Sequence, residues 1–163
     1  MGVVHVTVQD CTTLFDSLSL GCVQPVPQTY VCKIRPGVNV SPNELGVPGR
    51  ALEASDIVES YKRIISLPQS NAFAFIGKEM ASQEAYADAA SYTLKTNRPY
   101  AFFRPRIGSA INTVVPKAAL TDANIGQLKQ KAAGAGAFMP QSHTEAQGAP
   151  RRTNPHNNPP TKH

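Results

Sequence analysis

The amino-acid sequence predicts an α+β fold: a small single domain with a short N-terminal β-hairpin or sheet, about three helices and a disordered C-terminal tail. Segments with strand-like alternation occur near the N-terminus, a helical apolar periodicity follows, and the last 24 residues contain few apolar side chains. A chain of 163 residues is long enough for one domain with a buried core. We therefore expect residues 1–139 to be globular and residues 140–163 to be a disordered, basic, Pro/Asn/His-rich tail.

Two segments of the N-terminal part repeat apolar side chains every second residue, which is the period of a half-buried strand. Residues 4–8 alternate valine with polar side chains. In residues 30–34, Tyr30, Cys32 and Ile34 lie on one face of the predicted strand. These two segments are expected to form the N-terminal hairpin or sheet.

The connecting segments are predicted from their turn-forming residues. Residues 12–20 are expected to form a short helix, although their Ser and Thr side chains compete for backbone hydrogen bonds. Pro25 and Pro27 indicate a loop before the second strand. Residues 36–50 are rich in proline and glycine and are predicted to form another loop.

The clearest element is a helix that begins near residue 54 and continues through residue 65. Its apolar side chains recur three or four residues apart and form one face, which consists of Ala54, Ile57, Val58, Tyr61, Ile64 and Ile65. On the outer face Glu59 can pair with Lys62, which adds roughly 0.2–0.5 kcal/mol. Pro68 ends the helix, since proline cannot continue the hydrogen-bond ladder.

Two further helices and one strand are expected in the C-terminal half. The alanine-rich residues 72–95 predict a second helix, in which Gly77 is a candidate break. Residues 111–115 carry Ile and Val side chains and are expected to form a short strand. A third helix is predicted after Thr121, a residue that suits the N-cap position, and it should end before Gly134.

Charge is distributed unevenly along the chain, whose total is +5. Residues 41–92 hold seven acidic and four basic side chains, a net charge of −3. Residues 93–131 hold seven basic side chains and one acidic side chain, a net charge of +6, and the last 24 residues add +2. A basic segment that follows an acidic one indicates a polyanionic partner or an acidic neighbouring subunit.

The three cysteines, Cys11, Cys22 and Cys32, match no metal-binding spacing. We expect reduced, partly buried thiols in a cytosolic protein, with a disulfide between two of them as the alternative. The N-terminal residues lack the basic region and the long apolar run of a secretory signal. No stretch approaches the roughly 18 apolar residues of a membrane span. These features predict a cytoplasmic location, or a virion if the protein is viral, and no membrane partner.

The sequence contains no recognisable catalytic motif. It has neither a phosphate-binding loop nor a dinucleotide-binding or nucleophile-elbow pattern. Three of the four histidines lie in the predicted tail, and His5 has no defined geometry relative to Cys11. We therefore predict a non-enzymatic protein without catalytic residues, cofactor, metal site or evident small-molecule substrate.

The segment NRPYAFFRPRIG, residues 97–108, combines three arginines with three aromatic rings. Cationic grooves and stacking aromatic faces are what proteins use to bind single-stranded nucleic acids. The candidate nucleic-acid-binding residues are Lys95, Arg98, Tyr100, Phe102, Arg104, Arg106 and Lys117, with the cations on phosphates and the two rings on bases. In the alternative interpretation the phenylalanines are buried. Of the two, Phe103 is the better candidate for stability.

The function predicted from these patterns is that of a non-enzymatic structural protein that binds RNA or single-stranded DNA within an assembly. A viral coat or nucleocapsid-like protein or a ribonucleoprotein subunit would suit the size and charge, and a homo-oligomer or larger assembly is expected. Two alternatives stay open. One is a protein-interaction or scaffold subunit without nucleic acid, in which residues 97–108 dock into a partner. The other is a small enzyme or inhibitor whose site is spread over loops.

Overall fold

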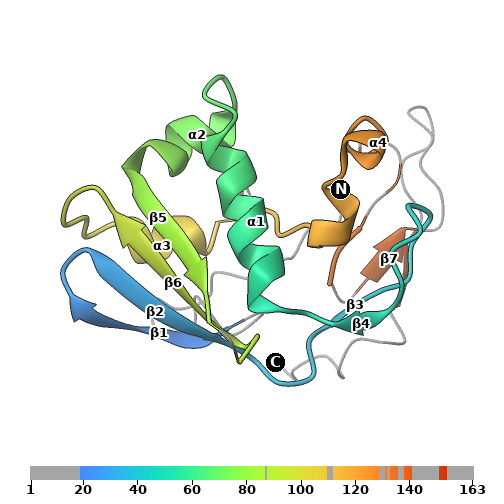
Figure 1. Cartoon of the computed structure of the whole chain (residues 1–163), viewed down its shortest axis with the longest axis horizontal. Helices are drawn as coiled ribbons and strands as arrows, with labels where there is room; N and C mark the ends of the chain where they lie inside the picture. The colour runs from blue at the N-terminus through green and yellow to red at the C-terminus, as the bar shows by residue number, and fades with distance from the viewer. Residues whose placement is uncertain are drawn as a thin grey trace.

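The computed structural model describes residues 19–86, 88–109, 112–128, 131, 133–135, 138–140 and 151–153. The predicted strand at residues 4–8, most of the predicted helix at residues 12–20 and most of the predicted tail lie outside these residues. The described part is an α+β structure with a four-stranded antiparallel sheet and few helices (Figure 1). The predicted fold class is confirmed in this broad form.

The main sheet contains the strands β1 (Ser19–Val26), β2 (Thr29–Ile34), β6 (Ser91–Thr96) and β5 (Met80–Ala85), in the order β1-β2-β6-β5. All neighbouring strands run antiparallel. The sheet therefore consists of two hairpins, β1–β2 and β5–β6, that are joined by the pairing of β2 with β6. Strands β1 and β5 form its two edges.

The other elements are short, apart from one helix. The helices are α1 (Ala54–Ile65), α2 (Asn71–Phe75), α3 (Phe103–Ile107) and α4 (Asp122–Ile125), with 3-10 turns η1 (Gly77–Glu79) and η2 (Lys117–Ala119). Strands β3 (Asn39–Val40) and β4 (Arg50–Ala51) form one two-stranded ladder, and β7 (Phe138–Pro140) and β8 (Arg151–Thr153) form another. The ladder of β7 and β8 links segments on both sides of residue 140. The division into a domain of residues 1–139 and a tail of residues 140–163 stays a prediction.

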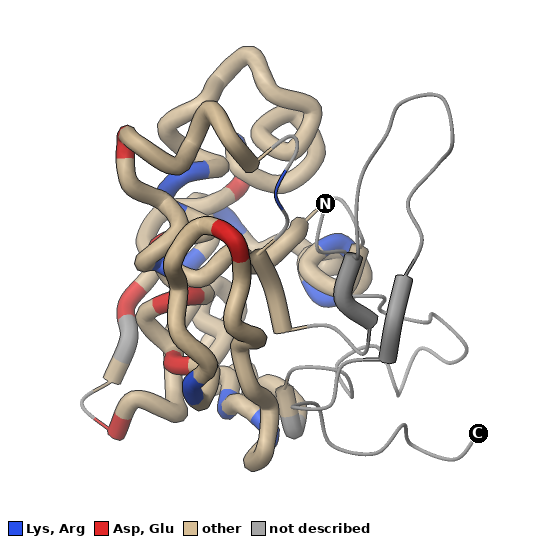
Figure 2. The backbone as a smooth tube through the Cα atoms, turned by 90° about the vertical axis from the view of Figure 1, so that its right-hand side faces the viewer, with Lys and Arg blue, Asp and Glu red and all other residues tan. Residues whose placement is uncertain are grey.

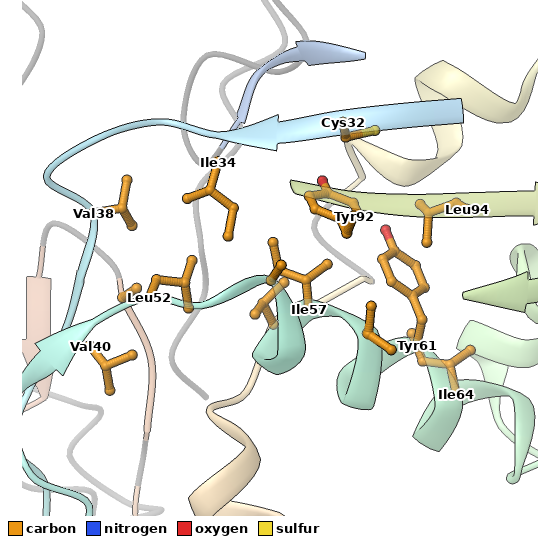
Figure 3. Close-up of a cluster of buried hydrophobic side chains, with 14 of the residues drawn as sticks. Cys32, Ile34, Val38, Val40, Leu52, Ile57, Tyr61, Ile64, Tyr92 and Leu94 are labelled. Carbon is orange, nitrogen blue, oxygen red and sulfur yellow. The ribbon is translucent and has the colours of Figure 1, made fainter. Parts of the chain in front are cut away.

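The core lies between the sheet and α1, as Figure 3 shows. Strands β2 and β6 direct alternate side chains toward the helix, and α1 directs its apolar face back toward them. The buried side chains on these three elements include Tyr30, Cys32, Ile34, Ile57, Tyr61, Ile64, Tyr92 and Leu94. Burying a large apolar side chain contributes roughly 1.5–3 kcal/mol. The predicted alternation in β2 and the predicted apolar face of α1 are confirmed.

Helix α1 agrees with the prediction at both ends and on its outer face. It spans Ala54–Ile65 and ends before Pro68. The Lys62 ammonium lies 2.7 Å from the Glu59 carboxylate, the pairing expected for these positions. Both side chains are about half exposed, so this ion pair adds little to stability.

The predicted helix at residues 72–95 is wrong. Only α2 is helical there, and the chain then forms η1 and the β5–β6 hairpin. Gly77 begins η1, and a Cβ at this position would lie 2.8 Å from the Phe73 ring, so this turn requires glycine. Further on, Asp88 accepts hydrogen bonds from the backbone of Ala90 and Ser91, which fixes the turn before β6.

Three shorter predictions also need correction. Residues 19–26 form β1 instead of the end of a helix and a loop, because an edge strand tolerates Pro25, whose missing N–H costs no ladder bond. The described part of the predicted strand at residues 111–115 has no regular structure. Helix α4 begins after Thr121 as predicted, but it ends at Ile125.

Candidate functional site

The segment 97–108 lies at the end of the sheet, beside the turn between β1 and β2 (Figure 1). The Thr96 N–H donates to the Gln28 carbonyl at 2.9 Å, and the Gln28 side chain donates to the Asn97 carbonyl at 3.2 Å. Residues 97–102 form a bend and a turn, and α3 follows. The extended or turn conformation that Asn97, Pro99 and Pro105 favour is thus found up to residue 102, and the helix α3 after it was not predicted. Pro105 is compatible with α3 because it lies in the first turn, where its missing N–H is not needed.

The three aromatic rings of this segment have different environments. Phe103 is 0% exposed, and its ring centroid lies 4.5 Å from that of Tyr30. Phe102 is 67% exposed. Tyr100 is partly buried against the core, and its ring lies 6.3 Å from the Phe102 ring in an edge-to-face arrangement. Phe103 is thus confirmed as a core residue, whereas the alternative that both phenylalanines are buried is wrong.

Two of the three arginines contact α2 and η1. Arg98 pairs with Glu79 through two hydrogen bonds of 3.1 and 3.2 Å, and this contact lowers the pKa of the Glu79 carboxyl. Arg106 donates to the Phe75 carbonyl. Its guanidinium also lies 4.9 Å from the Phe75 ring centroid and 5.3 Å from the Tyr100 ring centroid, within cation–π range. These side chains fasten the segment to α2 and η1.

The two lysines of the predicted site lie elsewhere. Lys95 is exposed on β6, and its neighbour Leu94 faces the core, so the Lys95 side chain belongs to the opposite face of the sheet. Lys117 pairs with Glu53 at 2.7 Å, next to the N-terminus of α1. Arg98 and Arg106 contact elements that follow the C-terminus of α1, a helix about 18 Å long. The predicted residues therefore do not form one continuous site.

Basic and acidic residues are interspersed in the described part of the chain. In Figure 2 the positions of Lys and Arg lie among those of Asp and Glu on the face shown. Four ion pairs, Arg50–Asp56, Lys62–Glu59, Arg98–Glu79 and Lys117–Glu53, neutralise part of the charge among the described residues. The net charge of +6 in residues 93–131 is thus partly compensated by the acidic segment before it.

The pairing of β2 shows which backbone groups of β1 face the outer edge of the sheet. The Ile34 N–H donates to the Ala90 carbonyl at 2.8 Å, so the backbone of Ile34, and by alternation that of Cys32, faces β6. Cys22 lies directly opposite Cys32, with a Cα–Cα distance of 4.1 Å, as in a non-hydrogen-bonded pair. The N–H and C=O of Cys22 therefore point away from β2, toward the edge of the sheet that pairs with no described strand.

Arg104 contacts this edge, because its guanidinium donates to the Cys22 carbonyl. Burial raises the pKa of the nearby Tyr30 hydroxyl, while the positive charge of Arg104 acts in the opposite direction. Two further exposed apolar side chains, Val23 and Val26, belong to the same strand. Sequence analysis found Phe102 and Arg104, but it missed β1 because it assigned the prolines to a loop.

A disulfide links Cys22 of β1 to Cys32 of β2. The prediction of reduced thiols is therefore wrong for these two cysteines, and the alternative of a disulfide is confirmed. Cys11 lies outside the described residues. A sequence signal for the pairing did exist, because the two cysteines lie on either side of a segment with two prolines.

Removal of the disulfide by the double substitution Cys22→Ser and Cys32→Ser is expected to lower the free energy of unfolding by about 2–3 kcal/mol, because the unfolded chain regains the entropy of a closed loop. Urea unfolding followed by circular dichroism measures the change. Dithiothreitol should destabilise the wild type by a similar amount and leave the double variant unchanged. An effect of dithiothreitol on the double variant would show that another bond is involved.

The described residues contain no evident metal or membrane feature. Within the described ranges no group of three or more His, Cys, Asp and Glu side chains is placed to hold a metal ion. No helix in the same part of the chain is long and apolar enough to cross a membrane.

No protein-family model matches the sequence, and no curated protein sequence matches it. Solved structures, however, match the fold. The ABC transporter-associated periplasmic binding protein DppA from Helicobacter pylori, in complex with the peptide STSA, is 17% identical with a TM-score of 0.74; the match covers 88% of this chain and 31% of that chain.

Two other matches have different ligands. The PBP/SBP MoaA from A. tumefaciens R10, in complex with mannopinic acid, is 19% identical with a TM-score of 0.69, and the match covers 86% of this chain and 27% of that chain. NikZ from Campylobacter jejuni, in complex with Ni(L-His), is 16% identical with a TM-score of 0.68 and the same two coverages, 86% and 27%. This chain thus spans less than a third of the solved structures it matches, and at these identities the likeness is one of fold.

These comparisons contradict the predicted function. A structural protein of the capsid, nucleocapsid or ribonucleoprotein kind is not what the fold indicates, because the matching structures are binding proteins solved with a peptide, mannopinic acid or a nickel–histidine complex. The predicted RNA or single-stranded DNA partner and the expected lack of a small-molecule ligand are wrong for the same reason. The predicted cytoplasmic or virion location conflicts with the periplasmic DppA. The absence of enzymatic activity stays a prediction.

Proposed function

We propose that this chain forms one structural unit of a periplasmic solute-binding protein whose ligands are short peptides or other small molecules. The observation that carries the proposal is the fold match, which covers 86–88% of this chain in three binding proteins with different ligands. The proposed role is binding without chemical conversion, in keeping with the lack of a catalytic motif in the sequence.

The share of each matching protein that this chain covers also indicates how large the proposed unit is. The matched region makes up 27–31% of their chains, so in those proteins further polypeptide accompanies it. Residues 1–139 are proposed to be a single folded domain that corresponds to this region. Ligand contacts made by one such unit alone are expected to be fewer, and binding weaker, than in a complete binding protein.

The disulfide between Cys22 and Cys32 supports the proposed location. Disulfides form and persist in oxidising compartments such as the bacterial periplasm, and they are rare in the reducing cytosol. This argument is independent of the fold comparison. Together the two observations favour a protein that functions outside the cytoplasm.

The proposal is tested by adding candidate ligands to the purified chain. The panel consists of the peptide Ser-Thr-Ser-Ala, mannopinic acid and Ni(II) with L-histidine, each at millimolar concentration. A ligand present at 100 times its Kd stabilises the folded state by about 2.7 kcal/mol, and a bound ligand should therefore raise the Tm by several degrees. Isothermal titration calorimetry then measures the Kd.

The control is urea-unfolded protein, to which none of the three ligands should bind specifically. Nickel requires a second control with imidazole in place of L-histidine, because the chain contains four histidines that bind free metal. If no member of the panel changes the Tm or gives a binding isotherm, the proposed function is wrong.

A further inference from the structure

We propose that the chain binds the surface of an anionic phospholipid bilayer through the turn that follows β6. The contacting side chains are those of Lys78, Arg98, Tyr100, Phe102 and Arg106, which we call the basic turn surface. The inference goes beyond the proposed function and requires no bound solute. Hydropathy predicts no membrane partner for this chain, because it detects spanning segments and not an exposed ring beside cations.

The turn presents an apolar ring to solvent. Five of the six side chains in residues 97–102 are exposed, and Phe102 at the end of the turn is 67% exposed. Its ring contacts that of Tyr100 at a centroid distance of 6.3 Å, and Tyr100 is partly buried against the core. A ring that is supported in this way can enter the headgroup region of a bilayer while the chain stays folded.

Three cations lie beside these rings and share an acidic neighbour, Glu79. Hydrogen bonds from Arg98 lower the pKa of Glu79, and the charges of Lys78 and Arg106 act in the same direction. The Arg106 guanidinium lies 5.3 Å from the Tyr100 ring centroid, which joins the cations to the rings. Three positive charges against one negative charge leave a net charge of +2 beside the exposed ring.

The small size of this surface favours a bilayer over a protein as the partner. A stable protein interface covers about 800 Å² on each partner and depends on matching shapes. The turn offers six residues and one large exposed apolar side chain, Phe102. A bilayer has no fixed shape, and its attraction grows with the buried apolar area and with each cation near anionic headgroups.

The test measures how the purified chain partitions to sedimented vesicles. One set of vesicles contains phosphatidylglycerol and phosphatidylcholine in equal parts, and the other contains phosphatidylcholine alone. The wild type should bind the anionic vesicles roughly 20- to 30-fold more strongly, about fivefold for each of the two net charges. Most of this preference should disappear at a salt concentration of about 0.5 M, because salt screens the attraction.

Two substitutions separate the contributions of charge and ring. Lys78→Ala should lower the partition coefficient to anionic vesicles about fivefold. Phe102→Ala should lower it roughly 5- to 30-fold, the effect of leaving two-thirds of a phenylalanine side chain in water. Both side chains are exposed, so both variants should keep the urea midpoint of the wild type. Should either variant be unstable, the comparison of the two vesicle types on the wild type decides.

A tryptophan in place of Phe102 reports insertion directly, since the chain contains no tryptophan. The emission of Phe102→Trp should shift to shorter wavelength when anionic vesicles are added, and brominated lipid should quench it. Tyr86→Trp is the matched control, because Tyr86 is 49% exposed and pairs with Ser91 at the opposite end of β6. Its emission should stay unchanged.

A second control concerns the total charge of the chain. Lys33→Ala removes an exposed cation that lies at the other end of β2 from the turn, and it should change partitioning less than about twofold. Equal losses in Lys33→Ala and Lys78→Ala would show that binding follows net charge alone, which overturns the proposal.

The remaining outcomes also reject the proposal and leave the proposed solute binding untouched. Equal partitioning to neutral and anionic vesicles would exclude an anionic surface as the partner. Unchanged emission of Phe102→Trp in the presence of bound vesicles would exclude insertion of the ring. Binding to polyglutamate in solution that Lys78→Ala weakens and Phe102→Ala does not, without binding to vesicles, would assign the basic turn surface to an acidic protein.

Discussion

Replacement of Asp56 by alanine is expected to lower the free energy of unfolding by about 3–5 kcal/mol, the usual cost of breaking a buried ion pair by removal of one partner. The Asp56 side chain is fully buried, and Arg50 donates to its two oxygens at 2.8 and 2.6 Å. The same carboxylate accepts the backbone N–H groups of Glu53, at 3.0 Å, and Lys117, at 2.8 Å. Alanine would remove the acceptor that Arg50 of β4, the backbone before α1 and the first residue of η2 share.

The effect of this substitution should depend on pH. Burial alone raises the pKa of Asp56, but the hydrogen bonds from Arg50 and from the backbone of Glu53 and Lys117 outweigh burial and hold the pKa below its ordinary value. A carboxyl with a lowered pKa in the folded state stabilises the protein above its unfolded pKa, about 3.9, and loses that contribution as the pH falls. The difference between wild type and Asp56→Ala should therefore shrink below about pH 4.

Glu59→Ala is the matched control for Asp56→Ala. Both acids belong to α1 and pair with a basic side chain, but the Glu59–Lys62 pair is exposed. Its loss should change the free energy of unfolding by less than about 1 kcal/mol. Urea unfolding of the three proteins at pH 7 and pH 3.5 measures these differences. Equal effects of the two substitutions at pH 7 would refute the role given to Asp56.

Replacement of Phe103 by alanine is expected to cost about 3–5 kcal/mol, the range observed for a buried phenylalanine. Phe103 is completely buried, and its ring packs against Tyr30 at a centroid distance of 4.5 Å. Alanine would leave a cavity between α3 and β2 and remove the ring contact between the segment 97–108 and the sheet. The urea midpoint should fall accordingly, and the Arg104 contact with Cys22 should weaken with it.

The neighbouring Phe102 provides the control at the same point of the chain. It is 67% exposed, so Phe102→Ala should change the free energy of unfolding by no more than about 0.5 kcal/mol. A large loss of stability in Phe102→Ala, or a small one in Phe103→Ala, would contradict the assignment of the two rings.

Sequence periodicity predicted the elements whose side chains form the core. Helix α1 and strand β2 were found because each has one buried face, and burial imposes the spacing of 3.6 or 2 residues that the sequence displays. The β5–β6 hairpin was missed because the alanines of residues 72–95 suit a helix as well as a strand. The signal in the sequence was the alternation in β6, where Tyr92, Leu94 and Thr96 face the core. Tyr and Thr in this segment also favour strands.

The roles of the arginines could not be predicted, because their acceptors are remote in sequence. Arg98 pairs with Glu79 across 19 positions, Arg106 reaches the Phe75 carbonyl across 31, and Arg104 reaches Cys22 across 82. Charge counting treated all three as free cations and therefore favoured a polyanionic partner. Only the folded chain shows that most of this charge is used internally and that Arg104 contacts the edge strand β1.

The strand order β1-β2-β6-β5 has a consequence for the path by which the chain folds. Each hairpin closes a short loop, whereas the junction of β2 with β6 brings together residues as remote as Gln28 and Thr96, 68 positions apart. The entropy of closing that long loop must be overcome before the core contacts of α1 compensate for it. We therefore expect the meeting of the two hairpins across α1 to be the slow event in folding.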